Sequence, residues 1–260
     1  MEVLGYIGAL LIGLVLGLSG GGGSILTVPI LVYLLAIQPV TAMAYSLFIV
    51  GITSGFGAFQ NYKKGLVDFK NGFLFAIPSF VGVYLTRRFL VPLLPDVFIE
   101  APFLVTKDFF LMLLFAIIMI LAAYSMLKKK TEKTDNASVS FLQLGLQTFS
   151  IGILIGLVGA GGGFLIIPAL VLFVKLPMKK AVATSLFIIT LNSLIGFLGD
   201  VQNLSIDWRF LLSFTSLSVV GIFIGIYLNQ FINEKQLKKG FAYFVLVMAG
   251  FILVKEITVL

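Results

Sequence analysis

The stretch that decides the fold is Leu18-Ser19-Gly20-Gly21-Gly22-Gly23-Ser24, with Pro29 shortly after it. It interrupts an apolar run that otherwise extends from Val3 to Ile37. Consecutive glycines do not form a stable helix interior, because each costs about 1 kcal/mol relative to alanine. In lipid the unpaired backbone groups are costly, so such a break persists only inside protein or along a polar cavity. Each flanking piece is shorter than the roughly 20 residues a helix needs to cross a membrane.

Composition identifies the class of protein. Of the 260 residues, 60% are hydrophobic and only 11% are charged, which excludes a soluble domain. The apolar runs are long and do not alternate, so they predict membrane helices embedded in a lipid bilayer rather than strands. The net charge of +7 comes from lysines and arginines between the runs, as positive-inside topology requires, so no nucleic-acid partner is predicted.

A second glycine break lies 139 positions after the first, at Gly159-Ala160-Gly161-Gly162-Gly163-Phe164, with Pro168 after it. The same offset aligns Ser46-Leu47-Phe48-Ile49 with Ser185-Leu186-Phe187-Ile188. Shared glycine, serine and proline at one offset predict an internal repeat. We expect a first membrane repeat at 1–127, a linker at 128–140 and a second repeat at 141–260. Each repeat is predicted to hold a Gly-rich broken segment, re-entrant or spanning, and three further transmembrane helices.

The distribution of lysine and arginine predicts the sidedness. With the linker 128–140 in the cytoplasm, most lysine-bearing loops fall inside and both termini fall outside. The first break then opens from the outside and the second from the inside. The predicted fold is therefore an all-α polytopic membrane protein with two inverted-topology repeats, and paired glycine breaks of this kind indicate a transporter site.

The predicted spans contain no acid, base or histidine, so no catalytic residue, metal site or cofactor is predicted, and an enzyme is not expected. Half-helices starting at Ser24 and Phe164 would present free N–H groups and the positive ends of their dipoles. Two such ends form an anion site without fixed charge. The predicted substrate-binding set is the backbone of Gly22, Gly23, Ser24, Gly162, Gly163 and Phe164, with the side chains of Ser46, Ser185 and Asn192.

Other polar residues have simpler structural interpretations. Membrane serines and threonines often bond their own helix backbone, which we weigh equally with a binding role for Thr53, Ser54 and Ser193. Gly13 and Gly17 are interpreted as helix-packing positions, and Asp68 and Asp207 as helix N-caps. Arg87-Arg88 is interpreted as an interfacial anchor, with an entry funnel for anions as the alternative, and Phe89 to Lys107 as an external loop.

These residues resemble the sulfite exporter TauE/SafE family of bacterial membrane permeases. The resemblance rests on two pairs of segments, Gly17–Gly23 with Ala44–Phe48 and Gly156–Gly163 with Ala183–Phe187. It implies a multi-pass protein of the bacterial inner membrane that exports small sulfur oxoanions or organosulfonates. The resemblance also implies protons as the coupling ion. Because the predicted spans hold no titratable group, we expect such a proton to be carried by the substrate or to pass through Asp68 or Asp207 at the end of a span.

Competing functions stay open at this point. A secondary transporter with a midplane site is the first hypothesis, and a passive anion channel of the same architecture is the alternative. An intramembrane enzyme or scaffold subunit is disfavoured, because the chain lacks a nucleophile–base pair. The exact substrate, the direction of transport, the coupling ion and the oligomeric state, a homo-oligomer included, are not fixed by the sequence.

Overall fold

The chain folds into a bundle of helices in a computed structural model, which describes residues 2–99, 105–127, 141–231 and 234–259. The helices of the first half are α1 (Glu2–Ser19), α2 (Gly23–Pro29), the π-helical turn η1 (Ile30–Leu34), α3 (Pro39–Lys63), α4 (Phe69–Leu85), the π-helical turn η2 (Thr86–Leu90), α5 (Val91–Leu93) and α6 (Lys107–Leu127). Those of the second half are α7 (Phe141–Val158), α8 (Gly163–Phe173), α9 (Met178–Asp200), α10 (Trp208–Asn229) and α11 (Glu234–Val259).

Five of the described helical segments are long and apolar enough to cross a membrane: Pro39–Lys63, Phe69–Leu93, Lys107–Ser125, Lys179–Asp200 and Trp208–Asn229. Large apolar side chains on these helices face outward, with Leu93 78% and Leu121 61% exposed. Such a surface is suited to contact with lipid, because exposing this much apolar area to water is unfavourable. The prediction of an all-α polytopic membrane protein is confirmed.

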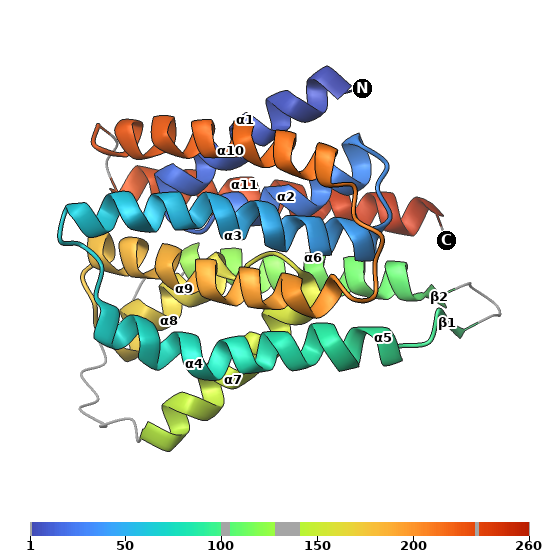
Figure 1. Cartoon of the computed structure of the whole chain (residues 1–260), viewed down its shortest axis with the longest axis horizontal. Coiled ribbons are helices and arrows are strands. Elements are labelled where there is room, and N and C mark those ends of the chain that lie inside the picture. The colour runs from blue at the N-terminus through green and yellow to red at the C-terminus, as the bar shows by residue number, and fades with distance from the viewer. Residues whose placement is uncertain (1, 100–104, 128–140, 232–233, 260) are drawn as a thin grey trace.

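Both glycine stretches interrupt helices. Helix α1 ends at Ser19 and α2 begins at Gly23, while α7 ends at Val158 and α8 begins at Gly163. Gly20 and Gly159 adopt left-handed φ angles of +72° and +66°, which glycine reaches without the steric cost of a Cβ. Each half-helix begins one residue earlier than predicted. At each break the chain turns back toward the end of the bundle from which it came (Figure 1).

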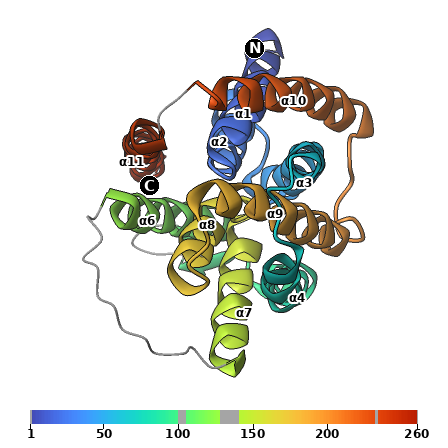
Figure 2. The same cartoon turned by 90° about the vertical axis from the view of Figure 1, so that its left-hand side faces the viewer.

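Each half contributes its first helix to the other half. Helices α3 and α9 pack together at the centre, α1 lies along α10, α7 lies along α4, and α6 lies along α11 (Figure 2). Glycine permits the close approach: a Cβ at Gly13 would overlap the Ser218 carbonyl, and one at Gly152 would overlap the Ser79 carbonyl. The packing interpretation of Gly13 is confirmed. The two halves are thus interlocked rather than laid side by side.

Asp68 and Asp207 occupy equivalent places at the starts of α4 and α10. Each carboxylate accepts a hydrogen bond of 3.1 Å from a first-turn N–H, so both are N-caps as predicted. The Asp68 N–H also donates to Thr184 Oγ1 at 3.0 Å, and the Asp207 N–H donates to Tyr45 Oη at 2.8 Å. The pKa of Asp68 lies below its ordinary value, chiefly because the Asn71 N–H donates to it. Asp68 therefore stays ionised near neutral pH.

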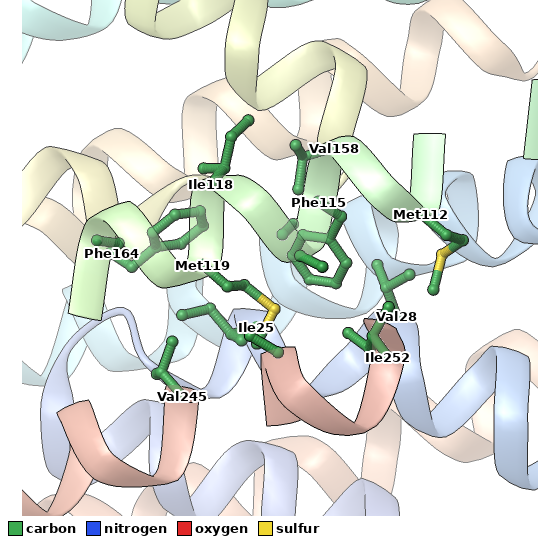
Figure 3. Close-up of a cluster of buried hydrophobic side chains, with 14 of the residues drawn as sticks. Ile25, Val28, Met112, Phe115, Ile118, Met119, Val158, Phe164, Val245 and Ile252 are labelled. Atoms are coloured by element: carbon green, nitrogen blue, oxygen red, sulfur yellow. The ribbon is translucent and has the colours of Figure 1, made fainter. Parts of the chain in front are cut away.

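The largest buried apolar cluster joins the α6–α11 pair to the half-helices. Figure 3 shows Phe115 and Met119 of α6 beside Ile25 and Val28 of α2, with Phe164 at the start of α8 in the same cluster. All five side chains are at most 3% exposed. Burying such side chains contributes roughly 1.5–3 kcal/mol each where water is the alternative. This cluster fixes the half-helices against the outer pair.

The segment predicted as an external loop is partly regular. From Thr86 the chain continues as helix through η2 and α5 to Leu93. Two short antiparallel strands follow, β1 (Val97–Ile99) and β2 (Val105–Thr106). The prediction of a loop over this whole segment was therefore wrong for its first part.

Candidate functional site

The two glycine breaks meet inside the bundle. A Cβ added at Gly21 would lie 2.7 Å from the Cα of Gly163, so the two backbones are in direct contact. A side chain at either position would separate them. The nine predicted substrate-binding residues are all buried: Gly22, Gly23, Ser24, Ser46, Gly162, Gly163, Phe164, Ser185 and Asn192. The contact between Gly21 and Gly163 defines the centre of the candidate site.

Helix α9 borders both breaks. The hydroxyl of Ser185 donates to the Gly20 carbonyl at 2.7 Å and is also 2.8 Å from the Val182 carbonyl. The hydroxyl of Ser193 lies at the second break, 2.8 Å from where a Cβ of Gly161 would stand. Gly161 itself has a φ of +64°. Glycine is therefore favoured at this position both by the left-handed backbone and by the lack of space for a Cβ. One helix thus connects the two breaks.

Buried polar atoms without protein partners lie on α9 itself, on α3, which packs against α9, and on α10, which packs against α3. We call this group the free-donor cluster, and among the described residues it consists of the hydroxyls of Ser46, Thr53, Ser54, Ser193 and Ser218 and the amide nitrogen of Asn192. All six residues are 0% exposed. Leaving a buried polar group unpaired costs about 1–3 kcal/mol, so natural cores rarely keep several of them together. A polar ligand would satisfy them.

Asn192 is the member of the free-donor cluster whose side chain also makes a hydrogen bond. Its Oδ1 accepts a hydrogen bond from Ser79 Oγ at 2.9 Å, which leaves Nδ2 as an unused donor. The positions that match Asn192 and Ser79 in the other half are Thr53 and Ser218. The sequence prediction missed both Ser79 and Ser218. Their signal was present, because the two serines lie 139 positions apart like the breaks themselves.

Several predicted donors are already used within the protein. The Gly22 N–H donates to Ser19 Oγ at 2.9 Å, so the prediction that it binds substrate conflicts with the structure. The Ser24 and Ser185 hydroxyls donate to carbonyls of the first break, and Phe164 places its ring in the apolar cluster. The cause is local: a tight glycine turn exposes carbonyls that nearby hydroxyls satisfy. Only backbone N–H groups remain for a ligand at Ser24 and Phe164.

The expectation that the membrane spans contain no acid or base was wrong, because the helices extend beyond the predicted apolar runs. Arg87 is 0% exposed and forms an ion pair with Asp200, with Nη2 and Nε at 2.6 and 2.7 Å from Oδ2. The interfacial-anchor interpretation therefore fails for Arg87. Arg88 is partly exposed and donates to Asn203 Oδ1 at 3.3 Å. The π-helical turn η2 directs Arg87 inward, and α9 continues to Asp200, beyond the apolar run that predicted it.

Comparison with known proteins identifies the type of protein. A family model described as "Sulfite exporter TauE/SafE" matches residues 6–252. A "Probable membrane transporter protein" from Xylella fastidiosa is 27% identical over 251 residues, covering 94% of this chain and 91% of the relative. The "Probable membrane transporter protein YunE" of Bacillus subtilis is 30% identical over 260 residues, covering 88% of each chain. No solved structure matches the chain.

Proposed function

Because the chain belongs to the sulfite exporter TauE/SafE family, we propose that it is a secondary transporter that exports small sulfur-containing anions such as sulfite or sulfonates. The observation that carries the proposal is the free-donor cluster, of which Ser193 lies beside the second glycine break. Hydrogen bonds to an ionised group contribute about 1.5–3 kcal/mol each, so a few such donors hold an anion. The cluster carries no fixed charge, which favours release as well as binding.

The two halves serve this function as inverted-topology repeats. Equivalent contacts support the proposal, since Gly20 faces Val182 while Gly159 faces Met43, again 139 positions apart. In Figure 1, α1 enters from the end of the bundle that holds both termini, whereas α7 enters from the opposite end. Repeats of this kind allow alternating access, in which the site opens to one side at a time.

The proposed mechanism uses the contact between the breaks as the fixed centre. In one state the anion reaches the free-donor cluster from the cytoplasm, and in the other it leaves to the outside. Asn192 supplies an oriented amide donor, and Ser46, Thr53 and Ser193 supply hydroxyls. Backbone N–H groups at Gly23, Ser24, Gly162, Gly163 and Phe164 complete the proposed shell. The bilayer seals the remainder of the bundle.

Replacing Asn192 by leucine tests the proposed site. Leucine has nearly the same volume but no donor, so exchange of labelled sulfite or thiosulfate across proteoliposomes should fall about 10- to 100-fold. The matched control is Thr215→Val, because Thr215 is also buried but its hydroxyl bonds the Leu211 carbonyl of its own helix. The control should exchange at the wild-type rate. Unchanged exchange by Asn192→Leu would contradict the assignment of the site.

The coupled transporter differs from a passive channel in a measurable way. Proteoliposomes with an imposed pH gradient should accumulate the anion above its external concentration if transport is proton-coupled. A channel only equilibrates the anion with the membrane potential. Because Asp68 and Asp207 serve as N-caps, protonation of either carboxylate would weaken its cap.

The topology is testable because the native chain has no cysteine. We expect both termini outside and the linker 128–140 in the cytoplasm of a bacterial inner membrane. An impermeant thiol reagent should label Thr258→Cys in intact cells and should label Thr131→Cys only after the cells are opened. Labelling of both variants in opened cells is the control. Labelling of Thr131→Cys in intact cells would show that the linker lies outside and that the predicted topology is wrong.

A further inference from the structure

The buried pair of Arg87 and Asp200 is the strongest feature that the free-donor cluster does not explain. Arg87 is 0% exposed and Asp200 is 4% exposed, and the guanidinium also reaches the Gly156 carbonyl at 3.4 Å. Burying two charges costs several kcal/mol per ion, and their attraction often only balances that cost. An apolar pair of similar size would serve packing equally well. The pair is therefore a candidate for a functional role.

Its position links it to the second glycine break. Gly156 lies in the last turn of α7, directly before the break that begins after Val158. Arg87 lies in η2, a π-helical turn, and such turns occur frequently at functional sites. A cation at the C-terminal end of α7 is also favoured by the helix dipole. The guanidinium is thus held beside the last turn of α7, next to the second glycine break.

In the other half of the chain, the positions that correspond to this ion pair at the offset of 139 hold uncharged residues. The positions that match Arg87 and Asp200 are Ile226 and Asn61. Ile226 packs in an apolar cluster with Leu16 and Ile222, and the Asn61 amide donates to the Gly57 carbonyl of its own helix. The architecture therefore does not need an ion pair here. Of these two matching places, both among the described residues, only the one with Arg87 and Asp200 is charged.

Few other ionisable groups face the pair. The elements packed against η2 and α9 are α3, α4, α5, α7 and α8, and in their sequences no other acid occurs. Arg88 in η2 is the adjacent cation, and the tyrosines of these elements are Tyr45 and Tyr62 in α3 and Tyr84 in α4. The backbone carbonyl of Tyr84 lies near Gly199. The remaining cations lie at the far ends of these helices (Figure 1): Lys63, Lys70, Lys179 and Lys180. Asp200 is thus the one carboxylate that neutralises Arg87.

We propose, on the basis of the transport function above, that Arg87 and Asp200 form a second anion site at which a proton and an anion bind together. Protonation of the Asp200 carboxylate breaks the ion pair and leaves the Arg87 guanidinium free to bind a sulfonate or sulfite oxygen. The net charge of the buried site is zero in both states when the anion carries one charge. Release of the proton restores the ion pair and displaces the anion. The site thereby couples proton and anion movement.

Binding of methanesulfonate tests this site, because its sulfonate does not titrate near neutral pH. In wild-type protein, affinity should rise about tenfold for each unit by which pH falls while Asp200 is ionised, with about one proton taken up per anion bound. In the double variant Arg87→Ile with Asp200→Asn, affinity should not change with pH and no proton should be taken up. This variant places at one end of the bundle the residues that the chain uses at the other. Asp200→Asn alone should bind methanesulfonate without pH dependence.

Exchange of labelled methanesulfonate, sulfite and thiosulfate in proteoliposomes at constant pH separates the two proposals. If wild-type protein exchanges none of these anions, the proposed function is wrong, and the proposal of this second site is wrong as well. If wild-type protein exchanges anions but the double variant keeps the same pH slope and proton uptake, the function stands and this site is wrong. A wild-type affinity that does not change with pH would also overturn the site.

Discussion

Replacing Gly21 by alanine should abolish transport. The added Cβ would lie 2.7 Å from both Cα and C of Gly163, distances that force backbone to move because no flexible side chain can yield there. Overpacking of this kind typically costs 1–3 kcal/mol, and more where only backbone can give. The displacement falls on the contact that defines the candidate site. We therefore expect anion exchange in proteoliposomes below about 1% of wild type, consistent with misplacement of several donors.

Alanine at glycines outside the breaks provides the control. A Cβ at Gly145 in α7 or at Gly250 in α11 would meet nothing within 4 Å. Both glycines lie in helices, where alanine is favoured by about 1 kcal/mol, so these variants should be as stable as wild type and fully active. Wild-type exchange by Gly21→Ala would show that the breaks need not touch during transport.

Breaking the buried ion pair should produce the largest loss of stability. Arg87→Ile alone leaves the Asp200 carboxylate buried without an ion-pair partner. Asp200→Asn alone leaves the Arg87 guanidinium buried without an ion-pair partner. Removing one member of a buried pair costs roughly 3–5 kcal/mol. The double variant removes both charges and should recover most of that loss. The cycle therefore predicts strong coupling between two residues that lie far apart in the sequence.

Unfolding in detergent micelles, followed by denaturant titration or thermal aggregation, measures the four members of this cycle. A double variant at least as unstable as the two singles combined would show that the pair contributes packing rather than mutual neutralisation. This measurement concerns stability only. It is independent of the anion-binding experiment, so each can fail without the other.

The sequence predicted the interruptions of the bundle because glycine, proline and serine have local consequences. Gly20 and Gly159 adopt left-handed φ angles that other residues rarely reach, so their requirement is visible in the residue type alone. Asp68 and Asp207 are N-caps for the same reason, since a cap depends on the next few residues only. The offset of 139 then predicted that these features come in pairs.

Partners across the fold could not be predicted in this way. The assignment of Gly22 as a substrate donor failed because Ser19 satisfies its N–H, and the hydroxyl of Ser185 is used by Gly20 from the other half. Arg87 was assigned to the surface because charge beside an apolar run usually marks a membrane boundary. Its neutralisation by Asp200 depends on the packing of η2 against α9, which no local pattern records.

The interlocked halves also set the order in which the protein can be completed during synthesis. Helix α1 packs along α10, yet Trp208 at the start of α10 is made about 190 residues after Ser19 at the end of α1. At ordinary translation rates of about 5–20 residues per second, this delay is roughly 10–40 s. During that interval the glycine face of α1 that includes Gly13 has no permanent partner. Lipid or a membrane chaperone must cover this face until the last quarter of the chain emerges.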